Sequence, residues 1–135
     1  LAELAQRVKD IALENQTEGG TEEADRQFHL AIAQATRNTA VYQAIEELWK
    51  LRRSSPESAL LHAKARFANI KPVVDEHSAI LEALRNRDPK AARSAMRTHL
   101  SSVLDSLLFA TEEKAIEEAR RAVAAKRDRY NRVSS

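Results

Sequence analysis

The sequence has no cysteine and little glycine or proline: of its 135 residues, 2 are glycine and 3 are proline. The absence of cysteine excludes disulfide bridges, thiol nucleophiles and cysteine-ligated metal sites. The scarcity of glycine and proline, together with 24 alanines, favours long helices with few turns over a β-sandwich or a barrel. No apolar run approaches the roughly 20 residues of a membrane span, and the first residues show no signal-peptide pattern. We therefore expect a cytoplasmic protein without membrane contact.

The remaining composition is typical of one globular domain. Hydrophobic residues make up 43% and charged residues 31% of a chain that is long enough to bury one core. The formal net charge of +2 is too small to argue for nucleic-acid binding by these residues. We expect a single domain over residues 1–135. Because the chain begins at Leu1, inside an amphipathic pattern, we also expect it to be part of a longer protein.

Helical periodicity continues along the whole chain, because apolar residues recur three and four positions apart. Interruptions divide the pattern into about six segments, and they fall at Gly19-Gly20, Asn38, 54–57, Pro72 and 86–89. The pattern predicts an all-α fold, an antiparallel bundle of about six helices. The last helix is expected to begin at about residue 89 and to continue into a long, charged, solvent-exposed C-terminal end.

Capping residues predict where two of the helices begin. Ser54 stands three residues before Glu57, as in a capping box. Asp88 followed by Pro89 is typical of an N-cap and a first helical position. Between these two starts, Pro72 should kink or divide a helix. The apolar face expected before that proline consists of Leu60, Ala63, Phe67 and Ile70.

The positions of the few histidines are the most informative feature of the sequence. Asp25 and His29 are four residues apart and so project from one face of a helix. His77 and His99 lie on apolar stripes, 11 residues before and 11 residues after Asp88. At a rise of about 1.5 Å per residue, both lie about 16 Å from that turn. Antiparallel packing of the hairpin therefore places the two imidazoles at the same level.

These residues are candidates for a divalent metal site. A lone histidine on an apolar face is more often a hydrogen-bonded core residue, and a lone aspartate near a helix start is more often on the surface. Two imidazoles level across a hairpin fit this description poorly, because burying both without a shared partner is costly. Three imidazole nitrogens and one carboxylate oxygen suit zinc or nickel. The sequence leaves open whether the helix over 21–37 faces the hairpin.

The other polar candidates are weaker. His62 lies off the apolar stripe and is expected to be exposed, and Trp49 is expected in the core. Arg52 and Arg53 are expected to end their helix in solvent. Common enzyme signatures are missing, since the sequence contains no ExxH, HExxH or glycine-rich phosphate loop, and no serine in a motif such as GxSxG.

Several short motifs resemble the C-terminal effector domain of GntR-family, FadR-type transcriptional regulators. The resemblance spans roughly residues 1–110 and rests on the order and spacing of the motifs at 25–29, 35–38, 76–84, 88–92 and 95–100. The segment 48–52 is similar to the hexuronate-responsive regulators. In the metal-using branch of this family an ion is held by one aspartate and three histidines. The matching positions here are Asp25, His29, His77 and His99.

The resemblance implies a regulatory domain and not an enzyme. We expect it to bind a small carboxylate, an organic or sugar acid, through a buried divalent metal such as zinc or nickel. We also expect a homodimer that contacts operator DNA through an N-terminal winged-helix domain, which is not among these residues. Arg66, 11 residues before His77, is a candidate second contact to the carboxylate if the kink at Pro72 is mild, although an exposed surface role is the simpler alternative.

Two other functions remain open at this point. A metal-dependent hydrolase could use an open zinc position with a bound water. No carboxylate base is evident for it, because Glu76 adjoins His77 but points about 100° away on the helix. A helical dimerisation module that binds no ligand is the other alternative.

Overall fold

The computed structural model describes residues 1–17 and 21–133, and these residues form six helices and no strand. The helices are α1 (Ala2–Glu14), α2 (Glu23–Ala35), α3 (Thr39–Ser54), α4 (Pro56–Phe67), α5 (Val74–Arg85) and α6 (Pro89–Val133). The all-α fold expected from the periodicity is confirmed. The expected break at Gly19-Gly20 falls largely outside the described residues.

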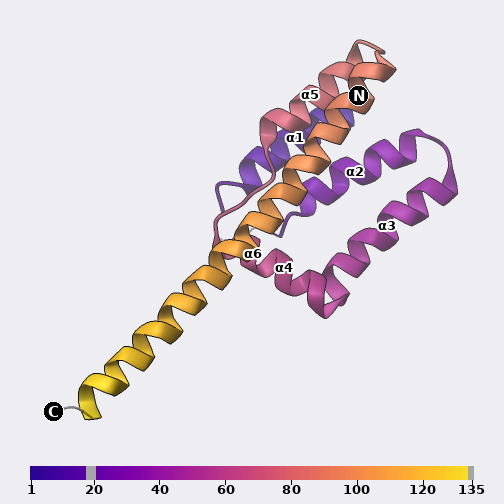
Figure 1. Ribbon diagram of the computed structural model, residues 1–135. Helices are drawn as coiled ribbons and strands as arrows, with labels where there is room; N and C mark the ends of the chain where they lie inside the picture. The colour runs from indigo at the N-terminus through magenta and orange to yellow at the C-terminus, as the bar shows by residue number, and fades with distance from the viewer. Residues whose placement is uncertain (18–20, 134–135) are drawn as a thin grey trace.

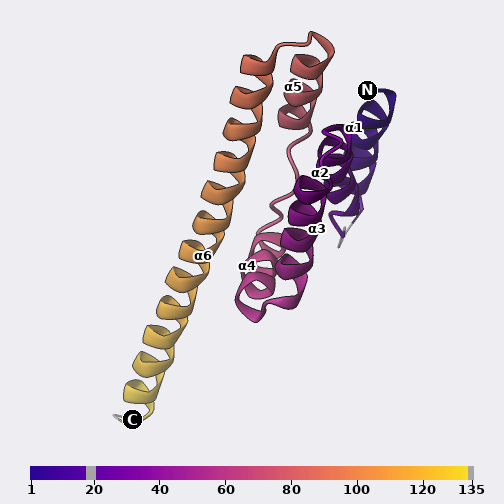
Figure 2. The ribbon, with the colours of Figure 1, turned by 90° about the vertical axis from the view of Figure 1, so that its right-hand side faces the viewer.

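The main core lies between α1, α2 and α5, and the first part of α6 packs against it (Figures 1 and 2). α1 packs against α2 and α5, α3 packs against α2 and α4, and α6 packs against α5 and α4. The buried centre of the core consists of Leu4, Val8, Ile11, Phe28, Ile80 and Leu81. On α1 these side chains recur every three or four positions, so this helix turns one apolar face toward Phe28 of α2 and toward Ile80 and Leu81 of α5. The core therefore fixes α2 and α5 relative to each other.

The hairpin of α5 and α6 begins its second helix where the sequence predicts. The Asp88 carboxylate accepts hydrogen bonds from the backbone N–H groups of Lys90 (3.0 Å) and Ala91 (2.9 Å). Pro89 occupies the first helical position, where its missing N–H costs nothing. This start fixes the register in which α6 runs back along α5.

The start of α4 differs from the prediction by one residue. Ser55, not Ser54, is the N-cap, and its hydroxyl oxygen accepts a hydrogen bond from the backbone N–H of Ser58 (3.4 Å). Ser54 is instead the last residue of α3. Pro72 lies between two separate helices, so it divides the expected helix and does not merely kink it.

The apolar face predicted before Pro72 is wrong at Leu60 and Phe67, whereas Ala63 and Ile70 are half-buried as that prediction allows. Leu60 is exposed, Phe67 has 86% of its surface exposed, and the buried residue of the helix is Ala65. α4 packs against α6, where Ala110 is also buried. Small side chains at such a contact allow two helices to approach closely. Leu60 and Phe67 are left on the outside, and Leu61 is half-buried.

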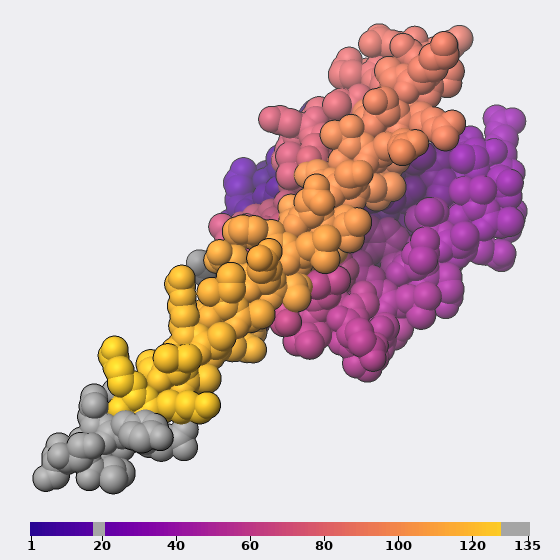
Figure 3. Space-filling model, in the orientation of Figure 1, coloured from indigo at the N-terminus to yellow at the C-terminus, as the bar shows by residue number. Residues whose placement is uncertain are grey.

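The C-terminal half of α6 extends beyond the rest of the molecule (Figure 3). Its side chains from Ala115 to Arg127 are exposed, as expected for the charged end of the chain. Across the part of the chain that the structure describes, none of the helices is both long enough and apolar enough to cross a membrane.

Candidate metal centre

One aspartate and three histidines converge at a single buried point. α2 contributes Asp25 and His29, α5 contributes His77, and α6 contributes His99. One potential ligand atom from each residue lies within 4.8 Å of the others. His77 has 0%, His99 2% and Asp25 7% of its surface exposed. The question that the sequence left open is thus answered, because α2 does face the α5–α6 hairpin.

The distances within the cluster are short. The Asp25 Oδ1 atom lies 2.8 Å from His77 Nε2 and 3.3 Å from His29 Nε2. The Nε2 atoms of His29 and His99 are 3.3 Å apart. The rings of His77 and His99 have their centroids 4.4 Å apart, so the expectation that these two imidazoles lie at the same level is confirmed.

Oxygen acceptors outside the cluster orient two of the imidazoles. His77 Nδ1 lies 2.7 Å from the Val73 carbonyl oxygen, one turn earlier in the chain, and His99 Nδ1 lies 2.8 Å from Glu76 Oε2. A proton on each Nδ1 donates to these oxygens and leaves each Nε2 pointing into the cluster, where it can either donate a proton to a neighbour or bind a metal ion. This arrangement is the usual support of histidine ligands in metal proteins.

Sequence reasoning missed the role of Glu76. It assessed this carboxylate only against His77, its neighbour on the same helix, and from there it points away. Because His77 and His99 are level across the hairpin, a residue next to His77 can reach His99 on the facing helix. The level pairing of the two histidines was the signal that could have identified it.

The electrostatics of the cluster favour an ionised carboxylate. Burial acts to raise the pKa of Asp25, but hydrogen bonds from His29 and His77 and their charges outweigh it and hold the pKa well below its usual range. Burial lowers the pKa of His77, yet its bonds to Asp25 and the Val73 carbonyl raise the pKa above the ordinary value. For His99, burial dominates over the contact with Glu76, and the pKa is lowered.

The donor set fits a divalent cation. Ligand atoms bound tetrahedrally to one zinc ion at about 2.0–2.1 Å lie about 3.3 Å from each other. His29 Nε2 lies at that distance from both Asp25 Oδ1 and His99 Nε2. Imidazole nitrogens whose lone pairs face one another at this range repel unless a proton or a cation lies between them. Three nitrogens and one oxygen are donors that zinc and nickel both accept.

A cavity of about 430 Å³ opens beside the cluster, between α2, α3 and α6. Asp25, His29 and His99 border it, and so do Trp49 and Arg52 from α3. Trp49 is half-buried and lies against His29 (6.3 Å between ring centroids), so its expected place in the core is wrong. The indole instead forms part of the cavity wall. A cavity of this size beside a cluster of polar groups is suited to a small molecule.

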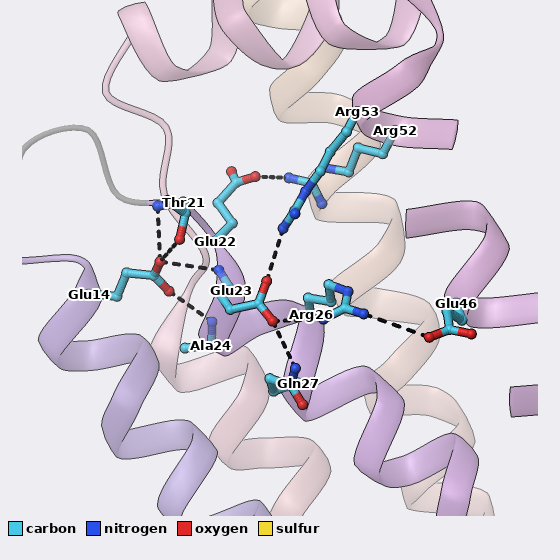
Figure 4. A network of polar contacts seen from close by, with 10 residues as sticks. All are labelled: Glu14, Thr21, Glu22, Glu23, Ala24, Arg26, Gln27, Glu46, Arg52 and Arg53. Carbon is cyan, nitrogen blue, oxygen red and sulfur yellow. Dashed lines mark hydrogen bonds and ion pairs between the residues drawn. The ribbon is translucent and has the colours of Figure 1, made fainter. Parts of the chain in front are cut away.

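Arg52 does not end its helix in solvent, contrary to the prediction. Its guanidinium lies 4.4 Å from the centre of the Trp49 ring and forms an ion pair with Glu22 (Figure 4). Glu22 precedes α2 in a left-handed conformation with φ 56°, which brings its carboxylate to the end of α3. Arg53, mostly exposed as expected, pairs with Glu23 at 2.9 Å. These pairs join the start of α2 to the end of α3.

The structure separates the remaining two candidates from the cluster. Arg66 is exposed and lines a different cavity, together with Glu14 and Glu22, because α4 ends before Pro72 and does not continue into α5. His62 is partly buried and not exposed as expected. Burial, followed by the charges of Arg52 and Arg66, lowers the pKa of His62 to about 4.

The model of the FCD domain family matches residues 1–102, so the chain belongs to this family. It is 34% identical over 105 residues to the Uxu operon transcriptional regulator of Escherichia coli, covering 77% of this chain and 41% of that protein. The chain is 33% identical over 110 residues to the Exu regulon transcriptional regulator of the same organism, and this match covers 78% of the chain and 43% of that protein. The Uxu operon regulator of Haemophilus influenzae is 32% identical to the chain over 104 residues, and this match covers 76% of the chain and 38% of that protein.

These matches confirm the resemblance to GntR-family, FadR-type effector domains, including the hexuronate-responsive type. The named relatives are transcriptional regulators, and neither the family match nor these relatives support the hydrolase alternative. The chain spans about two fifths of the length of these curated relatives. No solved structure matches the chain significantly.

Proposed function

We propose that the chain is the ligand-sensing domain of a transcriptional regulator, in which a divalent metal ion, zinc or nickel, binds a small carboxylate effector. Asp25, His29, His77 and His99 would hold the ion. The observation that carries the proposal is the convergence of these four donors, from three helices, at the edge of a cavity. The bound ion would supply a positive charge with open coordination positions for a carboxylate.

The surrounding residues have separate tasks in this proposal. Glu76 and the Val73 carbonyl hold the protons of His99 and His77 on Nδ1, which keeps both Nε2 atoms available. The ionised Asp25 balances part of the metal charge. Arg52 adds a fixed positive charge at the same cavity. Arg66 takes no part in effector binding in this proposal and stays an exposed surface residue.

In the longer protein, effector binding would alter DNA binding. We propose a cytoplasmic homodimer whose N-terminal winged-helix domains contact operator DNA. The cluster joins α2 to α5 and α6, so an effector that prefers one packing of these helices would shift the protein toward it. The names of the relatives, regulators of the Uxu operon and the Exu regulon, support this role.

Metal content tests the proposal. The 135-residue chain is loaded with zinc or nickel, dialysed and analysed for metal, alongside Asp25→Ala, His77→Ala and His99→Ala. We expect roughly one ion per wild-type chain and large losses in all three variants. His62→Ala, which removes a histidine outside the cluster, is the matched control and should retain the ion. Far-ultraviolet circular dichroism verifies that each variant is folded. Unchanged metal content in all three cluster variants would end the proposal.

Two further measurements sharpen the test. Glu76→Gln retains the shape of the side chain but removes its charge, and we expect metal affinity to fall by about 10- to 100-fold. A carboxylate at 100 times its Kd should stabilise the metal-loaded protein by about 2.7 kcal/mol and leave the EDTA-treated protein unchanged. Equal stabilisation with and without metal would show that carboxylates bind elsewhere.

A further inference from the structure

Two neighbouring arginines at the end of α3 pair with two neighbouring carboxylates at the start of α2 (Figure 4). Arg52 pairs with Glu22, and Arg53 pairs with Glu23 at 2.9 Å. The side chains of the first pair are 19% and 16% exposed, whereas those of the second pair are 57% and 42% exposed. Because the second pair joins the same two helices at the surface, joining them does not require a buried arginine. Desolvation makes a buried ion pair costly, so the burial of Arg52 points to a further role.

The Arg52 guanidinium is placed to meet a ligand of the metal centre. Arg52 lines the cavity beside the cluster, whereas Arg53 does not. Trp49 connects Arg52 with the cluster, since the centre of its ring lies 6.3 Å from that of His29 and 4.4 Å from the Arg52 Cζ atom. A small acid whose carboxylate is held at the cluster can therefore extend past Trp49 to Arg52.

The guanidinium is held in place and still has hydrogen-bond donors to offer. Its Nη2 atom donates to Glu22 Oε2, and its Cζ atom lies over the Trp49 ring. Among the residues that the structure describes, Glu22 is the one acceptor of its hydrogen bonds, and no Arg52 nitrogen is buried without a partner. Its other N–H groups are thus accessible to the oxygen atoms of a ligand. A guanidinium that is already held loses little freedom when it binds.

A ligand in this cavity needs such donors for any oxygen beyond its carboxylate. A polar ligand atom that is buried without a partner weakens binding by about tenfold. Thr36, which also lines the cavity, does not supply a donor, because its hydroxyl proton is bonded to the Ala33 carbonyl (2.7 Å). Arg52 can donate to more than one oxygen at once, and its charge strengthens each hydrogen bond. It therefore suits the closely spaced hydroxyl groups of a polyhydroxylated acid.

We propose that Arg52 binds the oxygen atoms of the effector beyond its carboxylate and makes the site selective for acids with hydroxyl groups along the chain. Glu22 is a positioning residue that acts through Arg52. The inference rests on the proposed function, since the carboxylate is placed at the cluster. It is carried by a largely buried guanidinium that is held on two sides and lines the same cavity. Of the organic and sugar acids that the sequence leads us to expect, it favours the sugar acids.

A matched pair of ligands tests the selectivity. D-Gluconate and 2-hydroxyhexanoate both have six carbons and the same 2-hydroxycarboxylate head, and they differ in the hydroxyl groups of the remaining chain. Titration calorimetry on the metal-loaded 135-residue chain should give a Kd about tenfold lower for D-gluconate, because a hydrogen bond to a charged group has about that effect. Equal or tighter binding of 2-hydroxyhexanoate would overturn the inference and leave the proposed function intact. Binding of neither acid would overturn both.

Two variants at the end of α3 assign the preference to one side chain. In Arg52→Gln we expect the preference for D-gluconate to fall by about tenfold, while the metal content stays that of the wild type. Arg53→Gln is the matched control, because Arg53 also pairs with α2 but does not line the cavity, and its preference should equal that of the wild type. A merely structural role of Arg52 would weaken both acids alike, since they share one head. An unchanged ratio of the two Kd values in Arg52→Gln would therefore overturn the inference.

Glu22→Gln tests the positioning role. The amide retains the shape of the side chain but removes the charge that holds the Arg52 guanidinium. We expect the preference for D-gluconate to fall severalfold, because a guanidinium that is free to move loses more freedom on binding. A wild-type preference in Glu22→Gln would overturn the role of Glu22.

Discussion

At the residue scale, the candidate site depends on which nitrogen of each histidine carries the proton. His77 and His99 both have Nδ1 within 2.8 Å of an oxygen acceptor, so their Nε2 atoms face Asp25 and His29. The sequence could predict that these histidines meet, because their distance from Asp88 is a matter of helical rise. It did not predict that Glu76 is the acceptor for His99, since this contact depends on the rotation of α6 about its own axis.

His62 is another residue whose neighbours the sequence did not reveal. Its surroundings in the structure lead to a prediction. Burial and two neighbouring arginines lower its pKa to about 4, while in the unfolded chain the pKa is about 6.5. Between these values the unfolded chain takes up a proton that the folded chain does not, so His62 makes folding less favourable as the pH falls from about 6.5 toward 4. Above about pH 6.5 it has no such effect.

Replacing His62 by glutamine should therefore weaken the pH dependence of stability. We expect the free energy of unfolding to fall less between pH 7 and pH 5 in His62→Gln than in the wild type. Urea denaturation followed by circular dichroism measures the free energy of unfolding of both proteins at both pH values. EDTA is present throughout, so that metal release plays no part. The same loss in the two proteins would mean that His62 titrates normally in the folded state.

At the scale of elements, six helices follow from apolar spacing and from caps such as Asp88, and the structure confirms them. The sequence could not predict which face of a helix turns inward when the helix packs through small residues. α4 buries Ala65 and exposes Phe67, because the geometry of its contact with α6 decides which face turns inward. Arg52 illustrates the same point at a helix end, where the distant Glu22 and the Trp49 ring keep its guanidinium from solvent.

The scarcity of glycine affects how the helices end. After α5 the N–H of Asp88 bonds to the Ala83 carbonyl (3.0 Å) and the N–H of Arg87 bonds to the Leu84 carbonyl (3.2 Å). This is the Schellman motif, in which glycine usually occupies the left-handed position. Arg87 occupies it here with φ 53°, and a side chain in that conformation costs about 1 kcal/mol.

Arg87→Gly should consequently stabilise the protein. We expect the free energy of unfolding to rise by up to about 0.5 kcal/mol, because relief of the left-handed strain exceeds the added entropy of the unfolded chain. Arg97→Gly is the matched control within α6, where glycine should lower it by about 1 kcal/mol. Both are measured by urea denaturation at pH 7. A loss of stability in Arg87→Gly similar to that in the control would show that the Arg87 side chain makes a stronger contribution than its backbone strain.

At the scale of the whole molecule, α6 combines two different parts. Its first part packs against α5 and carries His99, and the family match ends at residue 102. Beyond Ala110, which is buried, Lys114 still lies over the Phe67 ring at 5.5 Å, and from Ala115 to Arg127 the described side chains are exposed. Stability should therefore depend on the helix only as far as its contact with α4.

Shortening the chain tests this division. A chain that ends after Arg121 should unfold with a free energy within about 0.5 kcal/mol of the full value, because the described side chains that it removes, up to Arg127, are exposed. A chain that ends after Leu107 loses the buried Ala110 and should be less stable by roughly 1–3 kcal/mol. Urea denaturation at two protein concentrations measures both effects. A large, concentration-dependent loss on cutting after Arg121 would place the exposed end of α6 in an interface between chains, since only an associating surface makes stability depend on concentration.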